Sequence, residues 1–186
     1  MTEQPDFIVL GRSCGSCTLC CKVLPVPELD KPQGVWCSNC KPGGGCLIHP
    51  IRPQVCRGFF CGYLTVDNLG EEWKPERCRF VIMGELDGSR IGIHVDPDRP
   101  DAWRREPFYS RFKEWAARAV PIRGQVVVWV QRRITVIFPD RDVDLGILGE
   151  DEHVVTTQLP TAHGVILDAV KRKNDNPADP RAPLVS

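Results

Sequence analysis

Four cysteines fall within eight residues near the start of the chain, and this cluster limits the possible folds more than any other feature of the sequence. The run reads Cys14-Gly15-Ser16-Cys17-Thr18-Leu19-Cys20-Cys21. All ten cysteines of the 186-residue chain lie between positions 14 and 78. Closely spaced thiolates repel one another and oxidise readily, so a metal ion or an iron–sulfur cluster usually organises such a set. The sequence therefore predicts a metal-binding protein.

The composition argues against several other classes of protein. Lysine plus arginine equals aspartate plus glutamate at 24 each, so the net charge is zero and a general nucleic-acid partner is disfavoured. No stretch approaches the roughly 20 apolar residues of a transmembrane helix, and the apolar run from Phe7 to Leu10 is too short for a signal peptide. We therefore expect a cytoplasmic protein that has no membrane partner and keeps its thiols reduced. A disulfide framework would need export and is the weaker alternative.

The chain is expected to form an α+β fold, with a small, mostly antiparallel sheet and one main helix beside an irregular cysteine-rich lobe. We assign residues 1–172 to a single domain, with the metal-binding lobe at 11–80 and the sheet-and-helix scaffold at 81–160. The lobe is rich in cysteine, proline and glycine and has little periodicity, so metal cross-links would substitute for a core. Residues 173–186 are expected to be a disordered tail, whose polar composition begins near Lys171.

Periodicity predicts the elements of the scaffold. A helix from about Pro107 to Val120 would carry an apolar stripe, and Pro121 would end it. Apolar, β-branched runs predict strands. These strands are expected at residues 80–83, 90–95, 126–130, 134–138 and 154–157, with one more at 7–10.

The first cysteine cluster contains two overlapping Cys-x-x-Cys loops that share Cys17. A two-residue spacer lets both sulfurs of such a loop reach one ion. Cys20 and Cys21 are adjacent, and neighbours in extended backbone point in opposite directions. These two thiols could therefore serve different metals, or one could support the site without binding the metal itself.

A second cluster follows at residues 37–49. Pro42 and three glycines form a turn that would fold Cys37 and Cys40 back on Cys46 and His49, giving a Cys3His set suited to tetrahedral zinc. Cys56 and Cys61 supply further thiols. Together these clusters offer more ligands than one ion can use, so either two metals or one multi-iron cluster would bind. The candidate metal ligands are Cys14, Cys17, Cys20, Cys21, Cys37, Cys40, Cys46, His49, Cys56 and Cys61.

Several neighbouring residues are given simpler interpretations. Arg52 and Arg57 flank Cys56, and we expect their positive charge to lower the thiolate pKa values. Cys78 is interpreted as a buried core thiol and His94 as a structural histidine. The acidic, proline-containing run at 96–101 is expected to be a solvated connection.

The order of the cysteine motifs resembles that of a known family. The Cys-x-x-Cys-x-x-Cys-Cys opening at 14–21 is followed by Cys46-Leu47-Ile48-His49 and by Arg-Pro-x-x-Cys-Arg-x-Phe-x-Cys at 52–61. This arrangement resembles the YkgJ-type cysteine-cluster proteins, which are described as a zinc- or iron-chelating domain. The resemblance implies that the shared ligands are Cys14, Cys17, Cys20, Cys21, Cys46, Cys56 and Cys61. Other members often carry tyrosine at the place of His49, and Cys37 and Cys40 lie outside the most general motif.

The sequence favours a metal-binding role over a catalytic one. It contains no Gly-x-Ser-x-Gly, P-loop or His-Glu-x-x-His motif, so we assign no catalytic residue. The leading hypothesis is a protein that chelates zinc or iron. The alternative is an iron–sulfur enzyme or redox protein, and a related motif in flagellin lysine methylases implies methyl transfer as its chemistry. A zinc-dependent module that binds a protein partner is a third possibility.

Overall fold

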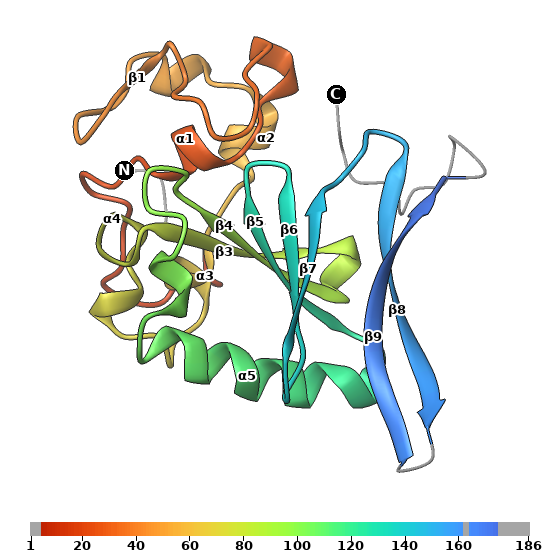
Figure 1. Ribbon diagram of the computed structural model, residues 1–186. Helices are drawn as coiled ribbons and strands as arrows, with labels where there is room; N and C mark the ends of the chain where they lie inside the picture. Colours follow the sequence, from red (N-terminus) through yellow and green to blue (C-terminus); the bar gives the residue numbers. More distant parts are fainter. Residues whose placement is uncertain (1–4, 162–163, 175–186) are drawn as a thin grey trace. The chain divides into compact units, whose positions relative to one another are not determined.

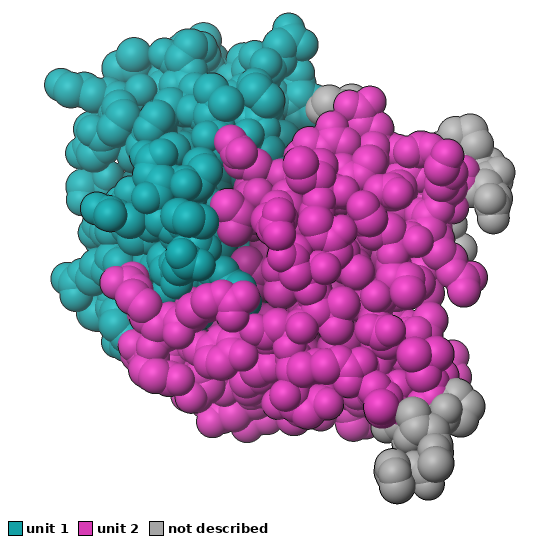
Figure 2. Space-filling model, viewed as in Figure 1, with its two compact units in different colours: residues 1–83, 93–103 teal, residues 84–92, 104–186 magenta. Residues whose placement is uncertain are grey.

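The computed structural model describes residues 5–161 and 164–174 and confirms the α+β architecture (Figure 1). The chain divides into two compact units (Figure 2). Unit 1 comprises residues 1–83 and 93–103, and unit 2 comprises residues 84–92 and 104–186. No helix among the described residues is long and apolar enough to cross a membrane.

One sheet has five strands in the order β3-β4-β5-β6-β7. Its strands are β3 (Phe80–Glu85), β4 (Arg90–Val95), β5 (Gln125–Val130), β6 (Arg133–Ile137) and β7 (Asp142–Ile147). The pairs β5–β6 and β6–β7 are antiparallel, with Val127 opposite Val136 in the first of them. Four of these strands match the apolar runs predicted from the sequence.

The apolar core of unit 2 lies between this sheet and a long two-stranded ribbon. The ribbon pairs β8 (Glu152–Thr161) with β9 (Gly164–Lys173) in antiparallel register. Inward residues of β5 and β6 pack with residues of the ribbon and of the loop after β7, because alternation places every second side chain on the same face. The buried cluster consists of Val127, Trp129, Ile134, Val136, Phe138, Leu148, Val154 and Ala169.

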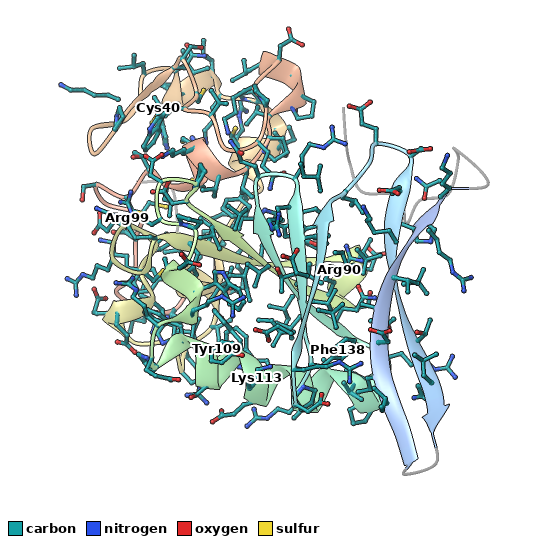
Figure 3. All side chains as sticks on the ribbon, in the orientation of Figure 1. Cys40, Arg90, Arg99, Tyr109, Lys113 and Phe138 are labelled. Carbon is teal, nitrogen blue, oxygen red and sulfur yellow. The ribbon has the colours of Figure 1, made fainter. Side chains whose placement is uncertain are left out.

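The main helix, α5 (Phe108–Ala119), also belongs to unit 2 and agrees with the predicted helix to within a residue at each end. Phe108, Phe112 and Ala116 are its buried residues, and the helix contacts β5 and β6. On another face, the Tyr109 hydroxyl and the Lys113 ammonium each donate a hydrogen bond to Asp142 (Figure 3). The helix passes into a short 3-10 turn, η6 (Val120–Ile122), at Pro121.

Unit 1 is built from short elements outside its sheet strands, as the weak periodicity of residues 11–80 predicts. Each of its helices spans three or four residues, because prolines, glycines and cysteine turns interrupt every potential longer run. The elements up to residue 78 are α1 (Cys20–Val23), η1 (Pro27–Leu29), β1 (Cys40–Lys41), β2 (Gly45–Cys46), η2 (His49–Ile51), α2 (Gln54–Arg57), α3 (Gly62–Thr65), η3 (Glu71–Trp73) and α4 (Pro75–Cys78). The 3-10 turn η5 (Ala102–Arg104) falls at the end of unit 1, whereas η4 (Leu86–Gly88) belongs to unit 2.

Of the two strand predictions near the chain ends, one is wrong and the other is correct but too short. Residues 7–10 form turns, because the Ile8 amide bonds the Pro5 carbonyl and the Val9 amide bonds the Leu64 carbonyl instead of a sheet partner. The strand expected at 154–157 extends over all of β8, since β9 pairs along its whole length. Consequently the expected disordered tail does not begin at Lys171 or at residue 173, which belong to β9, and residues 175–186 lie outside the described residues.

Strand β7 was not predicted, although its sequence carries a signal. Asp142-Val-Asp-Leu-Gly-Ile147 alternates polar and apolar residues, which is the pattern of a half-buried strand. Its acidic residues and glycine lower the β propensity and hide this alternation. Val143 and Leu145 pack against the apolar core of unit 2.

Candidate metal centre

The Cys14–Cys17 loop is a hydrogen-bonded turn. The Cys17 amide donates to the Cys14 carbonyl at 2.9 Å, and Gly15 takes the left-handed φ of +53° that the turn requires. The Ser16 hydroxyl donates to the Glu76 carboxylate at 3.0 Å, and Lys74 pairs with the same carboxylate at 2.8 Å. The loop is therefore fastened to helix α4.

Cys20 and Cys21 lie in helix α1, so the expectation of extended backbone at this pair is wrong. Successive helical residues differ by about 100° around the axis, which leaves the two thiols on neighbouring sides of the helix. The Cys21 thiol is in hydrogen-bonding contact with the thiols of both Cys20 and Cys40. Helix α1 therefore presents Cys21 to the second cysteine cluster.

The second cluster is organised by the β1–β2 hairpin. The Cys37 amide donates to the Cys21 carbonyl at 3.0 Å, and the Cys40 amide donates to the Cys37 carbonyl at 3.0 Å. The predicted turn places Cys40 directly opposite Cys46, and opposite residues of antiparallel strands point to the same face (Cys40 is labelled in Figure 3). The buried Thr18 hydroxyl accepts the Gly43 amide at 3.1 Å and bonds the Cys40 sulfur.

His49 does not join these thiols in a recognisable four-ligand set. It is exposed at the start of η2, where its carbonyl accepts a hydrogen bond from Arg52 at 2.8 Å. Across residues 5–161 and 164–174, no three side chains of the Cys, His, Asp and Glu types converge to enclose an ion. The donors fit a thiophilic metal by their chemistry, since sulfur is the preferred ligand of zinc and iron.

Cys56 and Cys61 belong to two different thiol neighbourhoods. Cys56, in α2, interacts electrostatically with Cys21, Cys37 and Cys46. Cys61 is buried just before α3 and interacts with Cys14 and Cys17 instead. Cys56 and Cys61 are only five positions apart, yet their thiols have different neighbours.

Cys78 is the buried core thiol that the sequence predicts. Its side chain is 1% exposed, and its S–H group lies within hydrogen-bonding distance of the Trp73 carbonyl at 3.3 Å and the Phe80 carbonyl at 3.2 Å. No disulfide joins any of the ten cysteines, all of which are among the described residues.

Burial dominates the acidity of the thiols and opposes the expected effect of the arginines. It raises the pKa of Cys40 and of Cys61 to about 11 and that of Cys78 to about 12. The pKa of Cys14 is also raised by burial, although Arg52 pulls it down. The lowering effect expected of the arginines is present for Arg52 at Cys14, but burial outweighs it.

Two buried lysines flank the thiols, and nothing in the sequence singled them out. The Lys31 ammonium donates to the carbonyls of Lys22 and Leu24 at the end of α1, the first at 2.7 Å. Burial lowers the pKa of Lys31 to about 8, while the nearby thiols of Cys21 and Cys37 act in the opposite direction. This amine is a positive charge placed where metal-bound thiolates would be negative.

Lys22, directly after Cys21, anchors helix α1 to the segment after β4. Its ammonium pairs with Asp96 at 2.7 Å and with Asp98 at 2.5 Å, and Arg79 bonds the other oxygen of Asp96. Asp96 is fully buried, so the expectation of a solvated connection over 96–101 is wrong at its first residue. His94, on β4, is buried and contacts the Gln33 amide at 3.2 Å, which agrees with a structural role.

Comparison with known proteins gives no independent assignment. No family model, no curated protein and no solved structure matches this chain.

Proposed function

We propose that the protein chelates zinc or iron through its cysteines and that this binding, rather than catalysis, is its role. The observation that carries the proposal concerns residues 14–61, here called the cysteine segment. This segment holds nine of the ten cysteines, all except Cys78. Its buried aliphatic residues are only Leu19, Val23 and Val26, in a stretch that the structure describes completely.

Such a segment lacks the usual means of holding a fold. Leu47 and Ile51, among others, have exposed side chains, so apolar burial contributes little to its stability. A structural metal supplies about 10–16 kcal/mol of apparent binding free energy, which is enough to replace a core. The thiols gathered by α1 and the β1–β2 hairpin offer the ligands, and the resemblance to a zinc- or iron-chelating domain agrees with this proposal.

The nature of the metal separates the proposal from its alternative, an iron–sulfur protein. Backbone N–H groups of Leu19 and Glu76 interact with the Cys17 sulfur, and those of Leu64 and Tyr63 interact with the Cys61 sulfur. Amide groups that point at sulfur tune iron–sulfur clusters and also stabilise thiolates bound to zinc. This observation keeps iron–sulfur chemistry, with redox or methyl-transfer activity, as the second candidate.

The test is elemental analysis of protein purified anaerobically without a metal-affinity tag, together with its visible spectrum. We expect zinc or iron in the wild type and less metal in Cys17→Ser and Cys56→Ser. Cys78→Ser is the matched control and should keep its metal. Metal content that is absent from the wild type, or unchanged in both variants, would refute the proposal. Acid-labile sulfide with visible absorbance would establish the iron–sulfur alternative.

A further inference from the structure

We infer that Cys40 and Cys46 form a reversible disulfide across the β1–β2 hairpin, with a low-molecular-weight disulfide as the oxidant. The pairing is argued from the backbone of the hairpin and does not depend on any metal. Its consequence rests on the proposed function and deepens it, because the bond would take two thiols away from chelation. Oxidation would therefore release metal, and reduction would restore the thiols.

The hairpin places the two cysteines directly opposite each other, Cys40 on β1 and Cys46 on β2. The Leu47 amide donates to the Asn39 carbonyl at 2.8 Å, which is the bond next to this pair in the ladder. The Cys40 amide is directed away from Cys46 and donates to the Cys37 carbonyl at 3.0 Å. Because hydrogen-bonded and non-hydrogen-bonded pairs alternate along an antiparallel ladder, Cys40 and Cys46 form a non-hydrogen-bonded pair.

A non-hydrogen-bonded pair has the spacing that a disulfide needs. Its α-carbons lie about 4.5 Å apart, and its two side chains point to the same face of the ribbon. Disulfides join residues whose α-carbons are about 4.4–6.8 Å apart. The thiols of Cys40 and Cys46 can therefore be joined with little movement of either strand.

The loop of the hairpin fixes this register locally. The Gly44 amide donates to the Lys41 carbonyl at 2.7 Å, and Gly43 has the φ of +70° that a turn with Pro42 at its first central position favours. The Thr18 hydroxyl accepts the Gly43 amide at 3.1 Å and so fastens the loop to the residues before α1. A slip of register would break both bonds, which keeps the two cysteines opposed.

Access favours this pair over the other thiols near Cys40. Cys40 and Cys46 are both partly exposed, and residues 41–44 between them are exposed, so a small oxidant can reach the pair. Cys37 is buried, with 9% of its surface exposed. Cys21, whose thiol also contacts Cys40, lies on helix α1, where its carbonyl accepts the Cys37 amide. An experiment must therefore distinguish Cys46 from Cys37 and Cys21 as the partner of Cys40.

The oxidation consists of two thiol–disulfide exchanges. The thiolate of one cysteine attacks a sulfur of the small disulfide, forms a mixed disulfide and expels one small thiol. The thiolate of the other cysteine then attacks the protein sulfur of the mixed disulfide and expels the second small thiol. The two protein thiols lose two electrons and two protons in total, and the small disulfide gains both. Burial raises the pKa of Cys40 to about 11, which slows the exchange without changing its products.

The test treats the protein as purified with oxidised glutathione under anaerobic conditions. Free thiols are alkylated, disulfides are then reduced, and the thiols released by reduction take a second, isotopically distinct alkylating group. Peptide fragmentation shows which cysteines carry the second group. Intact mass separates a disulfide within the chain, which removes two hydrogen atoms, from a glutathione adduct, which adds mass. A metallochromic dye measures the metal released into solution.

Two variants accompany the wild type. Cys46→Ser removes one partner of the pair, and Cys37→Ser is the matched control because it removes a neighbouring thiol outside the pair. We expect the second group on Cys40 and Cys46 in the wild type and in Cys37→Ser, release of metal, and reversal of the bond by dithiothreitol. Cys46→Ser should lose the intramolecular disulfide and form a glutathione adduct instead.

The second group on Cys37 or Cys21 in place of Cys46, glutathione adducts alone in the wild type, or an unchanged yield of disulfide in Cys46→Ser would overturn the pairing. The mapping of the wild type decides this point even where a variant folds poorly. A disulfide that forms while the metal stays bound would overturn the release of metal. A disulfide that forms in a wild-type protein without metal would support the pairing and refute the proposed function.

Discussion

The cysteine segment and unit 2 differ in the contacts that stabilise them. Unit 2 buries large apolar side chains on regular strands and a helix, with Val127 and Ile134 at 0% exposure. The cysteine segment has short turns, thiols, and large side chains such as Leu47 at 68% exposure. Its ordered contacts are instead hydrogen bonds, ion pairs and thiol neighbours. The comparison indicates that apolar burial stabilises unit 2 and contributes much less to the cysteine segment, which the proposed metal binding would stabilise.

Unit 1 also contains buried charged side chains near α1. Lys22, Lys31 and Asp96 are buried, and each is satisfied by hydrogen bonds or ion pairs. Buried charges stabilise a fold only when every partner is present, because an unpaired charge carries a large desolvation cost. The region around α1 is therefore expected to be sensitive to single substitutions of its charged residues.

Removal of the metal should have the largest effect. With a strong chelator present, we expect backbone amides of the cysteine segment to lose hydrogen-exchange protection, because about 10 kcal/mol of binding free energy is withdrawn. Amides of β5, β6 and α5 should keep their protection. Hydrogen exchange read by mass spectrometry measures both regions in one sample. An equal loss of protection in both regions, or no loss in either, would contradict the proposed difference in how the two regions are stabilised.

Phe112→Ala should have the largest effect among substitutions and should act on unit 2. Phe112 is 0% exposed on α5, and truncation of such a side chain costs about 3–5 kcal/mol through lost burial and the cavity left behind. Urea denaturation followed by circular dichroism measures the loss. Ile122→Ala, whose side chain is 79% exposed, is the control and should change stability by less than about 0.5 kcal/mol. The metal content of Phe112→Ala should stay at the wild-type level. A loss of metal that accompanies its loss of stability would contradict the independent stabilisation of unit 2 and the cysteine segment.

Asp96→Asn should destabilise unit 1 by about 3 kcal/mol at neutral pH, because it leaves the Lys22 ammonium buried with its main counter-charge removed. Burial raises the pKa of Asp96, but the Lys22 hydrogen bond and the Arg79 charge outweigh it and leave the pKa below its ordinary value. A depressed pKa gives stability that is present above the unfolded-state value, about 4, and is lost as pH falls through the folded-state value.

The matched control for this substitution is Asp98→Asn. Its side chain is 74% exposed and pairs with the same lysine, so its loss should cost under about 1 kcal/mol. Urea denaturation of both variants at neutral pH and near pH 4 measures the loss of stability in each variant and its dependence on pH. Similar losses for Asp96→Asn and Asp98→Asn would show that burial does not govern this network.

Gly146→Ala should have the smallest effect, about 1–2 kcal/mol. Gly146 has a φ of +70° at the irregular register between β6 and β7, and a Cβ in this conformation is strained although no neighbouring atom lies within 4 Å of it. Thermal unfolding should show the loss. Gly84→Ala, at a position with the same open space and an ordinary backbone conformation, should be close to neutral, and an equal loss there would remove the strain argument.

Much of the fold was predictable because its signals are local. The apolar runs that became β5 and β6, and the stripe on α5, follow periods of two and 3.6 residues that a sequence displays directly. The cysteine turns were predictable for the same reason, since a two-residue spacer and a glycine-rich hairpin are short-range features. Strand β7 carried its alternation too, but acidic residues and a glycine obscured it.

The sequence by itself determined the kinds of element and the dense cysteine pattern on which the proposal of metal chelation rests. Only the tertiary structure decided how deeply Asp96 is buried and that Arg12 bonds the backbone around Tyr63. These outcomes depend on contacts between residues that are tens of positions apart, such as Arg12 with Tyr63 and Lys22 with Asp96. Such contacts are set by the packing of whole segments, and no local period in the sequence records them.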